Sequence, residues 1–132
     1  ICGMTRTTSK AEIVKAAEEC IAYQIADIVN VMSQEAGISI DSMRVDGGPT
    51  RDRYLMQFQS DILSIPLLVS QVEELSGTGA AFVAGLALGI YNKGSLFSSM
   101  RWTQYQPVML PEVREKKYTG WKTAVSMVLT NK

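Results

Sequence analysis

The sequence contains no histidine, and this absence removes several kinds of chemistry at once. Histidine is the commonest general base near neutral pH and the commonest ligand of transition metals in proteins. A Ser-His-Asp triad, a papain-type Cys-His pair and a histidine-based zinc site are therefore excluded within these 132 residues. Any chemistry of the chain must depend on carboxylates, lysines or bound magnesium, or on groups outside this segment.

Cysteine is scarce as well, because Cys2 and Cys20 are the only two in the sequence. Two cysteines are too few for a disulfide framework, and they do not form a Cys-x-x-Cys pair. Cys20 falls on the apolar stripe of a predicted helix, so we expect a small core residue rather than a reactive thiol. This cysteine usage favours a reducing, cytoplasmic compartment.

The chain has no net charge, since thirteen basic residues balance thirteen acidic ones. No long-range field favours nucleic acid or an anionic membrane, so neither is an expected partner. A short basic run, Arg114, Lys116 and Lys117, alternates with Glu112 and Glu115. This alternation predicts a solvated helix face rather than a binding patch.

Long hydrophobic runs are also lacking. The longest uncharged apolar run, residues 79–91, is shorter than the roughly twenty residues of a membrane-spanning helix and predicts a buried helix instead. The N-terminus neither begins with methionine nor shows a signal-peptide pattern, so we expect a segment of a longer protein. With 46% apolar and 20% charged residues, the chain has the composition of one globular domain.

What the sequence does contain is a regular alternation of helix and strand signals. A capping box of Ser9 and Glu12 and a stop at Gly37 predict a long amphipathic helix over 10–36. Its expected apolar stripe is Ile13, Ala17, Cys20, Ile21, Gln24, Ile25, Ile28, Val29 and Met32. A short strand over 42–45 and a glycine turn should follow, with Thr50 capping the next helix.

The second half of the chain continues this alternation. Leu55, Phe58 and Ile62 share one face of the helix after Thr50, and residues 67–69 predict a second buried strand. A helix of small residues over about 79–91 should be capped by Ser76 or Thr78, and residues 93–109 should be irregular. Pro111 opens a last helix, whose predicted stripe is Tyr118, Trp121, Val125, Val128 and Leu129. The order indicates an α/β layer, although two strands make a marginal sheet.

One motif in this order has a functional interpretation. Asp46-Gly47-Gly48-Pro49-Thr50 places two glycines between a strand and a helix. Ligands of open α/β sheets collect at such strand ends, where glycine exposes bare backbone. Taken alone, however, the motif favours an ordinary tight turn, because it is neither a P-loop nor a Rossmann fingerprint.

Several segments taken together resemble the C-terminal domain of the FGGY carbohydrate kinases, over nearly the whole chain. They are Gly3-Met4-Thr5-Arg6, Ala11 to Ala16, Arg44 to Gly48, Leu55 to Leu63, Gly79 to Ala81, Ala84 to Ala87 and Tyr118 to Val125. The resemblance implies an α/β fold, the C-terminal portion of an actin-like (ribonuclease H-like) ATPase domain, with residues 1–132 lacking the upstream catalytic domain. It also implies ATP and Mg²⁺ as cofactors of the intact enzyme, and glycerol or a related polyol or sugar as its substrate. A homo-oligomer is expected.

The resemblance also implies site residues. Gly47 and Gly48 would line the adenosine pocket, and Asp52 stands where an asparagine of the family meets the adenine. An ionised aspartate can only accept hydrogen bonds, so Asp52 either accepts from the adenine amino group or caps the helix. No residue here is assigned to catalysis or to a metal, and the fragment alone is expected to be inactive. The alternatives are a non-catalytic, kinase-like binding or regulatory module and a kinase for another sugar such as xylulose.

Overall fold

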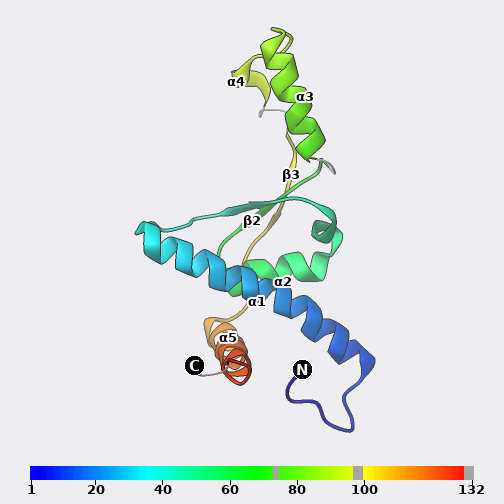
Figure 1. Ribbon diagram of the computed structural model, residues 1–132, viewed down its shortest axis with the longest axis vertical. Helices are drawn as coiled ribbons and strands as arrows, with labels where there is room; N and C mark the ends of the chain where they lie inside the picture. Colours follow the sequence, from blue (N-terminus) through cyan, green and yellow to red (C-terminus); the bar gives the residue numbers. More distant parts are fainter. Residues whose placement is uncertain (73–74, 97–99, 130–132) are drawn as a thin grey trace.

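The computed structural model describes residues 1–72, 75–96 and 100–129 and shows helices around a small sheet (Figure 1). In chain order the elements are α1 (Lys10–Ala36), β1 (Met43–Val45), the 3₁₀ helix η1 (Gly48–Arg51), α2 (Arg53–Leu63), β2 (Leu67–Ser70), α3 (Leu75–Ala87), α4 (Lys93–Leu96), β3 (Trp102–Tyr105) and α5 (Pro111–Ser126).

Helix α1 begins and ends at the predicted residues. The backbone N–H of Ser9 donates to Glu12 over 2.7 Å, and the N–H of Glu12 donates back to the Ser9 hydroxyl, which completes the capping box. The backbone hydrogen bond from Ser9 lowers the pKa of Glu12. At the other end Gly37 has a φ of 63°, the left-handed conformation that glycine adopts without steric cost.

The buried face of α1 differs from the predicted stripe. Its buried residues are Ala22, Tyr23 and Ala26. Ile21 and Ile28, by contrast, are 46% and 60% exposed, because residues two apart on a helix lie on different faces. The prediction that Cys20 is a core residue is also wrong: it is only half-buried and lies outside the core cluster. The side of α1 that carries Ile21 and Ile28 is therefore largely uncovered by the described residues.

The sheet contains three strands in the order β1-β2-β3. β1 pairs with β2 in parallel, with Val45 opposite Val69, and β3 pairs with β2 in antiparallel fashion, with Thr103 opposite Val69. The strand β3 corrects the prediction that residues 93–109 are irregular, although residues 97–99 lie outside the described residues. Its exposed Thr103 and Gln104 give no apolar alternation, so pairing with β2 rather than local pattern forms this strand.

The core lies between α2, α1 and the sheet. Leu55, Phe58 and Ile62 are buried as predicted and cluster with Leu67 and Val69 of β2. The cluster continues to α5, whose Tyr118 and Trp121 are partly buried against it. The sequence therefore predicts the apolar face of α2 correctly.

A buried carboxylate fixes the path of the chain from the sheet to α5. Asp61 of α2 is 6% exposed and accepts from the backbone N–H groups of Val108 and Met109, at 2.7 and 3.0 Å. These bonds satisfy a charge that burial would otherwise penalise. They hold the segment that follows β3 and precedes Pro111, the predicted first residue of α5.

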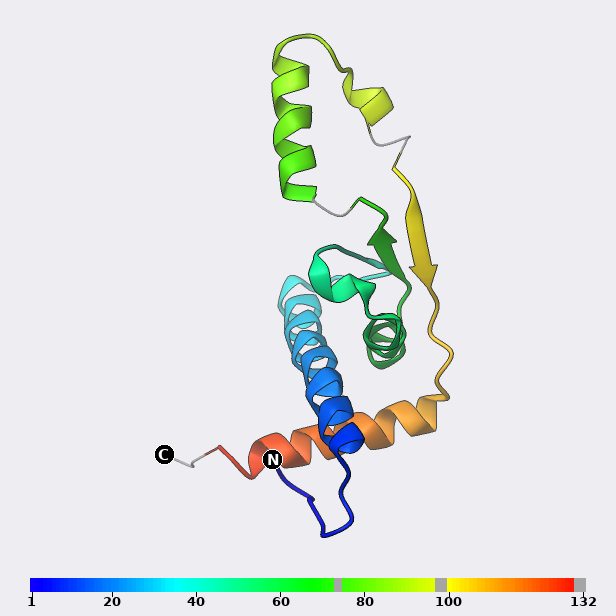
Figure 2. The same cartoon turned by 90° about the vertical axis from the view of Figure 1, so that its right-hand side faces the viewer.

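Helices α3 and α4 lie at one end of the molecule, away from α1 and α5 (Figures 1 and 2). Helix α3 begins at Leu75, earlier than predicted, and the chain reverses at Gly89, whose φ is 70°. The prediction of a buried helix is wrong within the described chain, because Val83 and Leu88 are 68% and 74% exposed. None of the described helices is both long and apolar enough to cross a membrane.

Candidate functional site

The glycine turn lies where β1 ends. Gly47 has a φ of 97° and a ψ of 175°, and its carbonyl accepts from both the backbone N–H and the hydroxyl of Thr50, at 3.1 and 2.7 Å. These bonds close the turn into η1. The hydroxyl of Thr50 therefore stabilises the turn and does not cap α2, which corrects the predicted role of this residue.

A cleft of about 280 Å³ opens beside the turn. It is lined by Gly47, Gly48, Thr50, Arg51, Val69, Ser70, Gln71, Val72 and Thr103. The parallel strands β1 and β2 both end here, which is the edge of an open α/β sheet where ligands bind. The structure thus brings the two predicted glycines to a cleft at the expected place.

The two glycines differ in what requires them. Gly47 needs to be glycine for its own conformation, since a φ of 97° strains any residue with a side chain. Gly48 has no positive φ, and a Cβ added to it would meet no atom within 4 Å. Nothing in the described chain requires glycine at position 48, whereas the close approach of a ligand to the backbone would require it.

Asp52 is half-buried and caps helix α2. Its Oδ1 accepts from the backbone N–H of Leu55 over 3.0 Å. It is not among the residues that line the cleft. The helix-capping alternative of the sequence analysis is therefore the role that the structure shows.

The sequence analysis did not find the part of the cleft formed by Ser70, Gln71 and Thr103. Ser70 and Gln71 directly follow the predicted strand 67–69. Because parallel strands end at the same edge of a sheet, these two residues could have been placed beside the glycine turn from the sequence. Thr103 gave no such signal, because its strand was predicted to be irregular. The Ser70 hydroxyl accepts from the N–H of Val72, and the Gln71 side chain donates to Thr103.

The cleft can hold a ligand mainly through neutral hydrogen bonds and bare backbone. Its lining contains hydroxyl and amide groups, one cation, Arg51, and no carboxylate among the described residues. It therefore offers binding and orientation but no general base. Within the part of the chain that the structure describes, no group of three or more His, Cys, Asp or Glu side chains is placed to hold a metal ion.

A second, larger hollow of about 580 Å³ lies over the first half of α1. It is lined by Lys10, Ala11, Val14, Lys15, Glu18 and Tyr54. This hollow is open and mostly apolar and has no glycine turn or strand end in its wall. The smaller cleft has the convergent polar groups typical of a ligand site, so we regard it as the candidate site.

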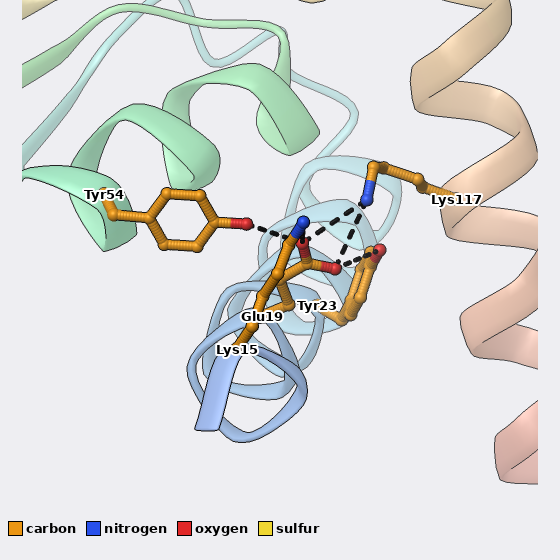
Figure 3. A network of polar contacts seen from close by, with 5 residues as sticks. All are labelled: Lys15, Glu19, Tyr23, Tyr54 and Lys117. Atoms are coloured by element: carbon orange, nitrogen blue, oxygen red, sulfur yellow. Dashed lines mark hydrogen bonds and ion pairs between the residues drawn. The ribbon is translucent and has the colours of Figure 1, made fainter. Parts of the chain in front are cut away.

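Behind the hollow, the carboxylate of Glu19 joins three helices (Figure 3). Tyr54 of α2 donates its hydroxyl to Glu19 Oε1 over 2.6 Å, and the Lys117 ammonium of α5 lies 3.3 Å from the same oxygen. Burial raises the pKa of Tyr54, and the hydrogen bond to Glu19 raises it further, so the hydroxyl remains a donor. Lys117 is half-buried and departs from the predicted solvated face, whereas Glu112, Glu115 and Lys116 are exposed as predicted.

The fold and the cleft define a class of protein that sequence comparison confirms. Residues 1–88 match the FGGY family of carbohydrate kinases, C-terminal domain. The chain therefore belongs to this family, and its fold is the C-terminal portion of the actin-like ATPase domain that the family shares. The family resemblance and the α/β fold class that we expected from the sequence are both confirmed.

The relatives that this chain resembles are glycerol kinases. It is 46% identical to glycerol kinase 1 of Thermotoga maritima and 43% identical to glycerol kinase of Brachyspira hyodysenteriae, with 98% and 93% of this chain covered. These matches cover only 27% and 25% of the relatives, so the chain spans about a quarter of their length.

Solved structures of carbohydrate kinases share the fold of this chain. The Plasmodium falciparum glycerol kinase with ADP superposes with a TM-score of 0.85 at 33% identity, covering 98% of this chain and 26% of that one. Gluconate kinase from Lactobacillus acidophilus, at 19% identity over 96% of this chain and 26% of that one, has a TM-score of 0.73 and shows a shared fold.

Proposed function

We propose that the intact protein carrying this chain is a glycerol kinase, which transfers the terminal phosphoryl group of ATP to a hydroxyl of glycerol. The observation that supports this most is the 43–46% identity to glycerol kinases over nearly the whole chain. The likeness to a glycerol kinase with ADP bound supports a nucleotide as one ligand. Residues 1–132 would form the C-terminal part of the nucleotide-binding domain.

In this proposal the cleft beside the Gly47–Gly48 turn receives the adenosine of ATP. The backbone at Gly48 allows close approach, and the residues at the ends of β1 and β2 orient the ligand through hydroxyl and amide groups. Asp52 holds the first turn of α2 and, although it lies outside the lining of the cleft, is the proposed acceptor for the adenine amino group. The chain thus binds and positions the nucleotide and supplies no acid or base to the reaction.

Mg²⁺ would accompany the phosphates of ATP and neutralise charge as the phosphoryl group transfers. Its ligands and the general base would come from parts of the intact enzyme beyond these residues. The protein would work in the cytoplasm on ATP and a polyol, as a homo-oligomer, without nucleic acid or membrane partners.

The test is phosphorylation by the intact protein with Mg-ATP, compared across glycerol, xylulose and gluconate under identical conditions. We expect glycerol to give the highest kcat/KM, by about a hundredfold or more, because a site built to bind one polyol loses binding energy with others. Preference for xylulose or gluconate would assign the protein to another kinase of the family. Nucleotide binding with no transfer to any of the three would favour a regulatory module.

A further inference from the structure

The Glu19 carboxylate is the most shared polar group among the described side chains. It is 12% exposed and lies at the junction of α1, α2 and α5 (Figure 3). Besides Tyr54 and Lys117, the Tyr23 hydroxyl donates to it over 3.5 Å and the Lys15 ammonium lies 3.7 Å away. Burial and the nearby Glu19 charge raise the pKa of Tyr23, so both tyrosines approach the carboxylate as neutral donors.

Among the residues of this cluster, Tyr54 lies nearest along the chain to the candidate site. It is the second residue of α2 and follows Asp52, the residue that caps the helix, by two positions. The N–H of Asp52 in turn donates to the carbonyl of Pro49 in η1, which directly follows the glycine turn. A short, hydrogen-bonded stretch of chain therefore connects Tyr54 to Gly48.

Two groups of contacts fix α2 on α1. Near the middle of α2, Phe58 packs edge-on against Tyr23 at 5.5 Å, and the Gln59 amide donates to the carbonyl of Ala22 over 3.2 Å. At the start of α2, the hydroxyl of Tyr54 binds Glu19. Leu55 and Met56 in the first turn of α2 are buried in the core, so the Tyr54 hydrogen bond orients a turn that apolar packing already holds. Without this bond the turn stays packed but loses its polar contact with α1, and a small displacement of the turn would pass to the glycine turn.

We propose that Glu19 is a positioning residue for the nucleotide cleft and acts through Tyr54, an inference that rests on the proposed function. The Lys117 ammonium lies 3.3 and 3.4 Å from the two carboxylate oxygens of Glu19 and holds the carboxylate in place. The start of α2, and hence the Gly47–Gly48 turn, is thereby tied to α1. Neither Glu19 nor Tyr54 lines the cleft itself.

The experiment uses the intact kinase and compares Tyr54→Phe, which removes only the hydroxyl, with Tyr118→Phe as the matched control. Tyr118 donates its hydroxyl to Asp27, which is a carboxylate on α1 like Glu19. Tyr118 itself belongs to α5 and is far along the chain from the glycine turn. We expect Tyr54→Phe to raise the Kd for ADP by about tenfold and the KM for ATP similarly. The KM for glycerol and kcat should stay within about twofold for both variants.

A second pair of variants separates positioning from loss of fold. Glu19→Gln retains an acceptor for Tyr54 and should recover most of the ADP affinity that Glu19→Ala loses. Unchanged ADP affinity in a folded Tyr54→Phe protein, or an equal loss in Tyr118→Phe, would overturn the inference. If the wild-type protein phosphorylates glycerol while Tyr54→Phe binds ADP normally, only this inference fails; if the wild type binds no nucleotide, the proposed function fails with it.

Discussion

Gly47, Gly48 and Asp52 occupy neighbouring positions and serve different purposes. Gly47 is required by its backbone conformation, and Asp52 is required to accept from the Leu55 N–H at the start of α2. Nothing within the described chain requires glycine at position 48. Gly48 differs from other unrequired glycines in lying at the cleft, so a ligand close to its backbone is the proposed reason for it. Whether the fold requires a glycine depends on its φ and on the atoms around it, and a sequence motif shows neither.

The capping role of Asp52 can be measured separately from any contact with a nucleotide. Replacing an N-cap aspartate by alanine costs about 1 kcal/mol, whereas asparagine caps about equally well. Asp52→Ala should therefore speed amide exchange at Leu55 by about fivefold in the absence of nucleotide. Asp52→Asn should leave it nearly unchanged, and an equal acceleration in both variants would contradict the capping role.

Asp27 is the second carboxylate of α1 that holds α5. It accepts from the Trp121 indole N–H over 2.7 Å and from the Tyr118 hydroxyl, and Trp121 stacks on Tyr23 at 5.4 Å. Charged hydrogen bonds of this kind contribute about 1.5–3 kcal/mol each. Asp27 therefore fixes where α5 crosses α1.

Asp27→Ala should loosen α5 and expose Trp121 to water. In the 132-residue chain with Trp102→Phe, where Trp121 is the one tryptophan left, its fluorescence should shift to longer wavelength. Glu35→Ala, which removes an exposed acid from the same helix, should leave the spectrum unchanged. An unshifted Trp121 emission in the folded Asp27→Ala protein would show that α5 is held by other contacts.

At the scale of elements, helix α3 ends in a close contact that needs a glycine. The carbonyl of Gly85 accepts from the N–H groups of Ile90 and Tyr91, and the Tyr91 ring packs edge-on against Phe82 at 5.8 Å. A Cβ at position 85 would lie 2.2 Å from Cδ2 of this ring. The ring must move if any side chain is added there.

Gly85→Ala should consequently release Tyr91 and destabilise the end of α3 by about 1–3 kcal/mol. Chymotrypsin, which cuts after aromatic residues, should cleave the variant at Tyr91 faster than the wild type. Gly79→Ala is the control in the same helix, because a Cβ at Gly79 meets no atom within 4 Å and alanine favours helix. Equal cleavage rates for the two variants would contradict the packing argument.

Elements with local signals could be predicted from the sequence, and elements formed by distant pairing could not. The capping box at Ser9, the stop at Gly37 and the first-turn Pro111 gave the bounds of α1 and the start of α5. Strand β3 was missed because only β2 makes it a strand. The wrong face of α1 was chosen because the most apolar side chains, such as Ile28, are exposed here.

The candidate site was predictable in part for the same reason. The Gly47–Gly48 turn follows a strand and can be predicted from neighbouring residues. Thr103, by contrast, lines the cleft from a strand far along the chain. The role of Asp52 needed the observation that η1 precedes α2, which moves the cap from Thr50 to Asp52. The family resemblance gave the adenosine interpretation, which remains a proposal.

For the whole molecule, the main feature is apolar surface without cover in the described chain. Large apolar side chains are exposed on α1 and around α3; they include Ile28, Val31, Met32, Val83, Leu88 and Ile90. Soluble monomers rarely expose large contiguous apolar patches. The relatives are about four times longer than this chain, and in them further chain is available to cover these faces.

The 132-residue chain produced alone should therefore self-associate and bind the dye ANS, while the intact protein should bind little of it. Sedimentation at several concentrations would show the mass increasing with concentration. A strictly monomeric chain that binds no ANS would show that these faces need no cover.

The measurement that tests the central claim most directly is the affinity of the intact protein for ADP, determined by calorimetry, with and without Gly48→Ala. Because the φ at position 48 is not positive and the added Cβ meets no atom, the fold should keep its stability or gain up to about 1 kcal/mol. We predict an affinity for ADP about tenfold or more weaker, with Gly37→Ala unchanged in affinity although its turn is strained. A stably folded Gly48→Ala protein with wild-type affinity for ADP would contradict the assignment of this turn to the nucleotide site.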